Sequence, residues 1–332
     1  MYDKVHKKSV HINYAIPPKR HPPMYYMHKY WARKPHNVVA KYIETYSRPE
    51  EVVLDPFSGS GVTPIEALKL GRKAVAIDLD PMSVFITRMT GIQINIDEFE
   101  DVFSLIEERV KDKIYDLYKT RCNRCGKCGV LSHVVWKMTD SDPAKEIPLE
   151  EWYYCDCEKG VQKKEFDEED KVMLEKISKM PIPYWVPDNE LLWNTRINVH
   201  KGTRVVDLFS HRSLIALSIL FHSIDELPEG NVKDLMKFVF TGFVVKASRM
   251  NFINVGGYKS LGRGWCVRGY WVPKEHMEQN VWNDFERQFG LVKKGKIQSS
   301  EEVKDFKEVD SFDDLQNGKG NIIVLNGSAL SI

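Results

Sequence analysis

Two acidic residues and two glycines in the first quarter of the chain are spaced to hold a small ligand. The stretch VVLDPFSGSG places Asp55 at the end of a short apolar run and Gly59 and Gly61 in the turn that follows, and Asp78 ends the next apolar run. Glycines at such a turn let the backbone approach a ligand closely, and a helix that begins there offers unpaired N–H groups. A carboxylate at the end of the second run can accept hydrogen bonds from both hydroxyls of a ribose.

The residues around this turn exclude two common nucleotide sites. A dinucleotide fingerprint requires a third glycine three residues after the second, where this chain has Pro64, and the Gly-Lys-Ser/Thr of a P-loop is absent. A nucleoside without phosphates remains, and S-adenosylmethionine is the common one; a purely structural turn is the alternative. Asp80 is predicted to cap a helix that Pro81 opens, which leaves Asp78 for the ribose.

Five of the six cysteines lie close together in the middle of the chain. CNRCGKCG supplies Cys122, Cys125 and Cys128, and YYCDC supplies Cys155 and Cys157. Structural zinc is held by four thiolates, usually from two short-spaced pairs. We therefore predict a structural Zn²⁺ site made of Cys122, Cys125, Cys155 and Cys157, with Cys128 as the spare thiol. Free thiols in a metal-free hairpin are the alternative.

The elements that position these residues begin as an alternation of strands and helices. Strands are predicted at 52–54 and 74–77 with a helix at 63–70 between them, which is typical of the first unit of a doubly wound α/β sheet. An amphipathic helix is predicted just upstream, at 35–47. Further along, the pattern predicts helices at 97–118, over much of 211–250 and at 281–289. It also predicts a helix that starts in the charge run KEFDEEDK, and a strand in NIIVLNGSALSI.

The basic residues gather in two aromatic-rich stretches, although the formal net charge is only +1. Residues 1–41 hold nine Lys and Arg and one acid, and residues 235–274 hold seven and none. We expect the first stretch to form an extended arm and both stretches to contact the phosphates of a polyanion such as a nucleic acid. Packing of the arm on its own domain, and docking of the second stretch on a partner chain, are the alternatives. No apolar run is long enough to span a bilayer, so a cytoplasmic location without membrane contact is predicted.

The segment from ARKPHNVVAK to AIDLDP closely resembles the amino-directed DNA methyltransferases, which modify adenine N6 or cytosine N4. Lys34-Pro35 matches the Lys-Pro element of that family, and residues 55–61, DPFSGSG, match its Asp-Pro-Phe-x-Gly-x-Gly turn. The resemblance covers about residues 30–90 and implies a Rossmann-like sheet that binds S-adenosylmethionine. The cofactor-binding residues that it implies are Lys34, Pro35, Asp55, Phe57, Gly59, Gly61 and Asp78.

A fainter resemblance connects the remainder of the chain with adenine-specific DNA methylases that contain a zinc ribbon. That subset carries a cysteine-rich module, then a stretch like residues 207–218 and one like 279–282, where Gln279 departs from the usual Glu. It implies adenine N6 as the target rather than cytosine N4. The expected parts are a cofactor-binding core with a basic arm at 1–100, a zinc-ribbon-like insertion at 119–165, a mainly helical insertion at 166–315 and a returning core strand at 316–332.

The catalytic element of that family has no match in this sequence. The element is Asp/Asn/Ser-Pro-Pro-Tyr/Phe/Trp, whose acceptors bind the target amino group and whose ring stacks on the flipped base. DPFS, DPMS, HPPM and IPYW each lack a required residue, so no catalytic residue is assigned. We therefore expect a truncated or split enzyme, inactive alone, whose catalytic element lies on a second polypeptide or a C-terminal segment. The alternatives are an RNA amino-methyltransferase and a non-catalytic DNA-binding or regulatory subunit.

Overall fold

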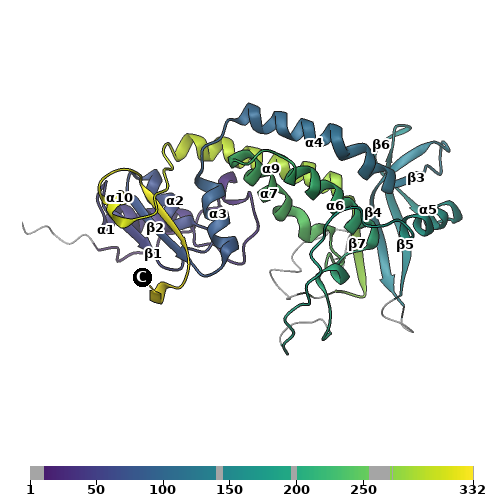
Figure 1. The fold of residues 1–332 in the computed structure, drawn as a ribbon, viewed down its shortest axis with the longest axis horizontal. Coiled ribbons are helices and arrows are strands. Elements are labelled where there is room, and N and C mark those ends of the chain that lie inside the picture. The colour runs from purple at the N-terminus through teal and green to yellow at the C-terminus, as the bar shows by residue number, and fades with distance from the viewer. Residues whose placement is uncertain (1–10, 140–144, 196–199, 254–269, 271, 332) are drawn as a thin grey trace, which may run out of the picture. The chain divides into compact units, whose positions relative to one another are not determined.

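The computed structural model of the chain describes residues 11–139, 145–195, 200–253, 270 and 272–331. The chain divides into two compact units, one formed by residues 1–96 with 291–332 and the other by residues 97–290. The first unit is built on a parallel sheet and the second on an antiparallel sheet with helices (Figure 1). The predicted α/β class with an inserted module and a helical region is confirmed at this level.

The sheet of the first unit has three parallel strands in the order β1-β2-β8. They are β1 (Val52–Asp55), β2 (Lys73–Asp78) and β8 (Ile322–Asn326). β2 is central, and its Val75 pairs with Leu54 on one side and with Ile323 on the other. All three predicted strands are confirmed. Because the strands are parallel, Asp55, Asp78 and Asn326 all lie at the carboxyl edge of the sheet.

Three helices cover one face of this sheet: α1 (His36–Tyr46), α2 (Val62–Lys69) and α3 (Pro81–Gly91). Ala74 and Ala76 of β2 pack in one buried cluster with Ala67 of α2 and Val84 of α3. The small side chains of β2 let the helices approach the strand closely. α1 and α2 agree with the predicted helices to within two residues at each end, and α3 begins at Pro81 as predicted.

The opposite face of the sheet is only partly covered. Leu315 of α10 (Phe312–Gln316) packs on Val75 and Ile77 of β2. Leu54 of β1 faces the same side as its pairing partner Val75, yet 57% of its surface is exposed. Within the described residues, β1 pairs with β2 alone, so its other edge is open as well.

The helix α9 (Val281–Glu302) is more than twice as long as the predicted helix at 281–289. Its second half belongs to the first unit, where Lys296 is fully buried. The Lys296 ammonium donates to the carbonyl oxygens of Met89, Thr90 and Ile92, at 3.1, 3.3 and 2.5 Å. These carbonyls end α3, so the lysine caps that helix from a second helix.

The sheet of the second unit is antiparallel, and the sequence analysis places none of its strands. The strands are β3 (Lys119–Arg121), β4 (Cys128–Met138), β5 (Glu146–Cys155), β6 (Glu158–Glu165) and β7 (Glu275–Gln279). They run in the order β3-β4-β5-β6, and β7 also pairs with β4 (Figure 1). The long hairpin β4–β5 brings the two cysteine-containing ends of the module together.

The helices of the second unit fall where the sequence predicts them. They are α4 (Ile96–Leu117), α5 (Glu168–Ser178), α6 (His211–Asp225), α7 (Asn231–Phe243) and the first half of α9. Arg212 of α6 lies 3.3 Å from Glu278 of β7, and both side chains are buried. Glu278 also accepts hydrogen bonds from Trp136 and Ser210. A buried ion pair thus joins the stretch at 207–218 to β7, which leads directly into the stretch at 279–282.

The described part of the N-terminal arm packs on the first unit. Met24, Tyr25 and Met27 are buried, and the chain forms a short 3₁₀ helix, η1 (Pro23–Tyr25), instead of remaining extended throughout. The Tyr25 hydroxyl donates to Glu66 of α2 at 2.6 Å. Residues 254–269 and 271 of the second basic stretch lie outside the described residues. None of the helices in the described ranges combines the length and apolar character that a bilayer crossing requires.

Candidate functional site

The predicted ligand site begins where β1 ends. Asp55 is buried, and its carboxylate lies 3.0 Å from the ammonium of Lys34. The same carboxylate accepts a hydrogen bond from the backbone N–H of Phe57 at 3.2 Å, which fixes the start of the turn. Lys34 is itself mostly exposed, so its charge reaches the surface beside the turn. Pro35 directly precedes α1, and its role follows from the resemblance alone.

Both glycines of the turn are required by the backbone. Gly59 and Gly61 have φ angles of +52° and +79°, which side-chain-bearing residues rarely adopt. A Cβ atom on Gly61 would lie 2.5 Å from the Oγ1 of Thr87 in α3. The turn therefore packs against the first turns of α3 with no room for a side chain.

Asp78 connects the glycine turn with the end of β2. Its carboxylate accepts the backbone N–H of Gly59 at 2.7 Å with one oxygen and that of Asp80 at 3.0 Å with the other. A carboxylate offers about four acceptor positions, so both oxygens retain capacity for a ligand. Asp80 instead accepts from Met82 and Ser83 in the first turn of α3, as the predicted cap does. The predicted cap by Asp80 is confirmed, and the binding of a ribose by Asp78 stays a prediction.

Large apolar side chains stand exposed directly after two of the strands. Phe57, after β1, is 73% exposed, and Leu79, after β2, is 75% exposed. They flank the carboxylates of Asp55 and Asp78 in the sequence. The carboxyl edge of the sheet therefore offers acceptors for hydroxyl groups beside apolar surface for a flat ring, which is the combination that a nucleoside requires.

Four cysteines converge in the second unit, and they are the four that the sequence predicts. The Sγ atoms of Cys122, Cys125, Cys155 and Cys157 all lie within 4.8 Å of one another. Two of the separations are 3.6 and 3.5 Å, close to the roughly 3.8 Å expected between thiolates at 2.3 Å from a tetrahedral zinc ion. Cys128 is not part of this group; its thiol contacts the carbonyl of Gly129. Hydrogen bonds from the Tyr153 hydroxyl and from the backbone lower the pKa of Cys122 to about 6, whereas the neighbouring thiols and burial raise the pKa of Cys157 to about 12, so Cys122 is the thiol that most readily forms a thiolate.

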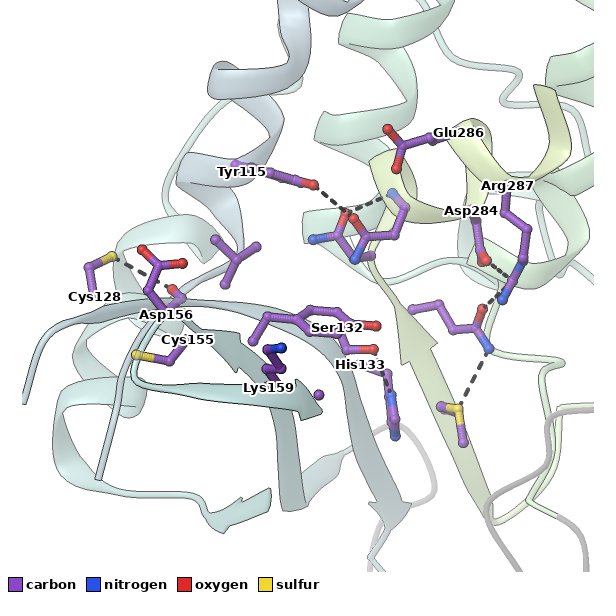
Figure 2. A pocket seen from close by; sticks show the side chains of 18 of the residues that line it. Tyr115, Cys128, Ser132, His133, Cys155, Asp156, Lys159, Asp284, Glu286 and Arg287 are labelled. Atoms are coloured by element: carbon purple, nitrogen blue, oxygen red, sulfur yellow. Dashed lines mark hydrogen bonds and ion pairs between the residues drawn. The ribbon is translucent and has the colours of Figure 1, made fainter. Parts of the chain in front are cut away.

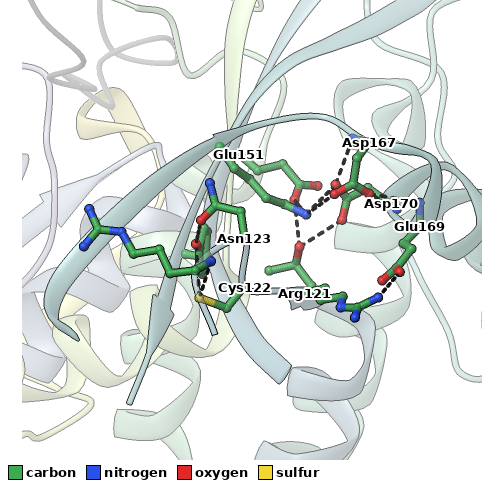
Figure 3. Close-up of polar contacts among 11 residues, drawn as sticks. Arg121, Cys122, Asn123, Glu151, Asp167, Glu169 and Asp170 are labelled. Carbon is green, nitrogen blue, oxygen red and sulfur yellow. Dashed lines mark hydrogen bonds and ion pairs between the residues drawn. The ribbon is translucent and has the colours of Figure 1, made fainter. Parts of the chain in front are cut away.

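A buried polar cluster supports the cysteine-bearing end of this sheet (Figure 3). The Lys164 ammonium of β6 lies 2.6 Å from Asp170 of α5 and 3.6 Å from Glu151 of β5. The Thr120 hydroxyl of β3 lies 3.0 Å from Glu151 and 2.9 Å from Asp170. Burial raises the pKa of Glu151 to about 7, and the nearby Asp170 adds to the effect. The cluster ties three strands and one helix together next to Cys122.

The second unit also contains a cavity of about 1270 Å³ that the sequence analysis does not anticipate. Figure 2 shows Tyr115, Asp284 and Arg287 on one side and Cys155 and Lys159 on the other. Acidic and basic side chains both line the cavity, and Arg287 is paired with Asp284. This mixed charge does not suit a polyanion. Its residues come from distant stretches without a common motif, which is why the sequence gives no signal for it.

Comparisons with known proteins find a similarity in the first part of the chain. Residues 3–88 match the N6/N4 methyltransferase family model, described as DNA methylase. A stretch of 46 residues is 44% identical to the putative methylase YubD of Escherichia coli (strain K12), and it covers 14% of this chain and 20% of that protein. The chain thus matches about a fifth of the length of this curated relative. No solved structure matches the chain significantly. The matched segment includes the glycine turn, Lys34 and Asp78, and over this segment the chain is similar to the DNA methylase family.

Proposed function

We propose that this chain is the cofactor-binding part of a DNA methyltransferase that methylates an exocyclic amino group, adenine N6 in preference to cytosine N4. The observation that carries the proposal is the joint placement of Gly59 and Asp78, held at 2.7 Å, within the segment that matches the DNA methylase family. In this proposal residues 1–100 and 316–332 form the cofactor core, 119–165 the zinc module and 166–315 a helical insertion.

S-adenosylmethionine, when bound, supplies the methyl group as part of a positively charged sulfonium. Asp78 accepts hydrogen bonds from the ribose hydroxyls, and the glycine turn admits the rest of the cofactor close to the backbone. Asp55 and Lys34 form an ion pair at the end of β1 that keeps the turn in shape. Phe57 and Leu79, both mostly exposed, provide apolar contact for the adenine ring.

Methyl transfer to an amino nitrogen depends on alignment more than on acid–base chemistry. Acceptors must orient the amino group, and no tetrapeptide in this sequence matches the element that provides them in the family. We place that element on a polypeptide segment that adds a strand to the free edge of β1. The support is that β1 pairs only with β2 in the described residues and that Leu54 is 57% exposed, whereas strands of parallel sheets are normally covered on both faces.

The four-cysteine group fits a structural zinc ion in this proposal. Four thiolates complete a tetrahedral site and leave no position for water or substrate. The role of the metal is therefore to hold the loop between β3 and β4 against the turn between β5 and β6, and Tyr153 supports the thiolate of Cys122. The surrounding β-sheet then forms a stable module.

The test is a two-stage assay on the full chain. Calorimetry should detect binding of S-adenosylmethionine, and no binding to the wild-type chain would refute the proposal. Transfer of labelled methyl groups to DNA amino positions should require a second polypeptide that carries the Pro-Pro-aromatic element. Robust transfer by this chain alone would refute the split arrangement.

Two further outcomes decide between the alternatives. Transfer to an RNA of the same sequence in preference to DNA would favour the RNA methyltransferase. A stable complex that binds both cofactor and DNA but transfers no methyl group would favour a regulatory subunit. Activity that falls with salt would support phosphate contacts by the basic stretches.

A further inference from the structure

The aromatic residue Tyr30 lies directly on the glycine turn. Its hydroxyl is 3.0 Å from the Oγ of Ser83 in the first turn of α3. Its ring and hydroxyl would lie 3.1 to 3.2 Å from a Cβ atom placed on Gly59. The N-terminal arm thus covers one side of the turn, and the absence of a side chain on Gly59 lets the Tyr30 ring approach the backbone this closely.

Trp31 extends this aromatic surface toward solvent. Its ring packs edge-on against Tyr30, with the centroids 5.3 Å apart and the planes at 77°. Trp31 is nevertheless 62% exposed, and an exposed tryptophan beside a candidate ligand site offers a large apolar face for contact. The arm below this pair is anchored, since Met24, Tyr25 and Met27 are buried. The two rings are therefore presented from a fixed base.

Two carboxylates and one arginine act on Tyr30. Burial raises the pKa of the Tyr30 hydroxyl, and the negative charges of Asp78 and Asp80 raise it further, whereas the hydrogen bond with Ser83 and the positive charge of Arg33 lower it. The positive charge of Lys34, on the same arm, is balanced by Asp55. Negative potential around aromatic rings adds to the attraction that their faces exert on a positive group.

The order of groups along the cofactor indicates which part of it meets Tyr30. In sheets of this kind the acid at the end of the second strand binds the ribose, and the glycine turn binds whatever is attached to the ribose 5′ carbon. In a dinucleotide that group is the pyrophosphate. In S-adenosylmethionine it is the sulfonium with its methionine chain. The part next to Gly59, and so next to Tyr30, is therefore positively charged.

We propose that Tyr30 and Trp31 form an aromatic contact for the sulfonium and so make the site prefer S-adenosylmethionine over its neutral product, S-adenosylhomocysteine. The proposal rests on the proposed function, because it assumes this cofactor. Tyr30 also positions α3 through Ser83, whereas Trp31 makes its contribution through the ring face. After methyl transfer the sulfonium charge is lost, so the site would bind S-adenosylhomocysteine less tightly and release it.

The test compares the two ligands on the full chain by calorimetry. Trp31→Ala should weaken S-adenosylmethionine binding about 2- to 30-fold, the range expected for a lost cation–π contact, and should change S-adenosylhomocysteine binding less. Trp31→Phe should restore most of the preference because it keeps an aromatic face. Tyr30→Phe keeps the ring and loses the Ser83 hydrogen bond, so it should retain the preference even if both affinities fall.

Tyr42→Ala provides the matched control, since Tyr42 is also an exposed aromatic residue of the first unit, 47% exposed, on α1. It should leave both affinities unchanged. Equal loss of both ligands in Trp31→Ala, or no loss of either, overturns the inference while the proposed function stands. Loss of DNA binding with unchanged cofactor affinities would overturn it in favour of a nucleic-acid contact. Failure of the wild-type chain to bind either ligand overturns the proposed function and this inference together.

Discussion

Substitution of Gly61 by alanine should destabilise the first unit in two ways, by backbone strain and by a steric clash. A side chain at φ +79° costs about 1–2 kcal/mol of backbone strain. The added Cβ would also lie 2.5 Å from Thr87 Oγ1, and such overpacking costs about 1–3 kcal/mol more. The expected total is about 2–5 kcal/mol of unfolding free energy. Because α3 and the turn would move apart, binding of S-adenosylmethionine should weaken as well.

The variant Gly71→Ala separates the backbone strain from the steric clash. Gly71 has a similar φ of +72°, but nothing lies within 4 Å of the position of its Cβ. Its alanine variant should therefore lose only the backbone term, about 1–2 kcal/mol. The two losses should differ by about 1–3 kcal/mol, and Thr87→Ala should recover part of that difference when combined with Gly61→Ala.

The measurement must report the first unit separately from the second. Hydrogen–deuterium exchange in increasing urea, read on peptides from β1, β2 and α3, gives that local free energy. Equal losses of unfolding free energy in Gly61→Ala and Gly71→Ala would show that the added Cβ of residue 61 does not clash with Thr87. A neutral Gly61→Ala would refute both the backbone and the packing arguments.

Three further outcomes are expected. Asp78→Ala should weaken S-adenosylmethionine binding by about 1–3 kcal/mol in calorimetry, whereas the exposed Asp313→Ala should not. Cys122→Ser should lose zinc in elemental analysis while Cys128→Ser keeps about one ion per chain; retention of zinc by the first, or its loss from the second, would contradict the assignment. Glu151 has a folded-state pKa raised from 4.5 to about 7, so the folded state holds the extra proton, and stability should fall as pH rises from 4.5 to 7. Glu151→Gln should flatten that dependence in urea titrations of the second unit, and an unchanged slope would argue against this origin.

The features that local patterns specify could be predicted from the sequence. The strands at 52–54 and 74–77 are short apolar runs on either side of a glycine turn, and the cap by Asp80 follows from its position before Pro81. The grouping of the four cysteines follows from their spacing. In each case the interacting residues are close together in the sequence, or they are clustered cysteines, a residue type with few other structural roles.

The features that depend on distant partners could not be predicted. β7 reads EHMEQ, and its Glu278 is buried only because Arg212, Trp136 and Ser210 satisfy its carboxylate. The second half of α9 is polar in sequence, and its Lys296 can be buried because backbone carbonyls at the end of α3 replace water as acceptors. Polar residues buried in this way remove the apolar periodicity on which such predictions depend.

The order of the parallel sheet also determines when the first unit can fold during synthesis. Ala74 of β2 pairs with Ile322 of β8, and the second unit lies between them in the sequence. At about 5–20 residues per second, β8 follows β2 out of the ribosome after roughly 10–50 s. Until then the apolar residues of β2 lack one neighbouring strand, and α3 lacks Lys296. Residues 97–290 form most of the loop that must close when β8 pairs with β2. If they fold early, this loop becomes effectively shorter and the entropy cost of closing it is lower. We therefore expect the nascent first unit to need protection by chaperones until its last strand arrives.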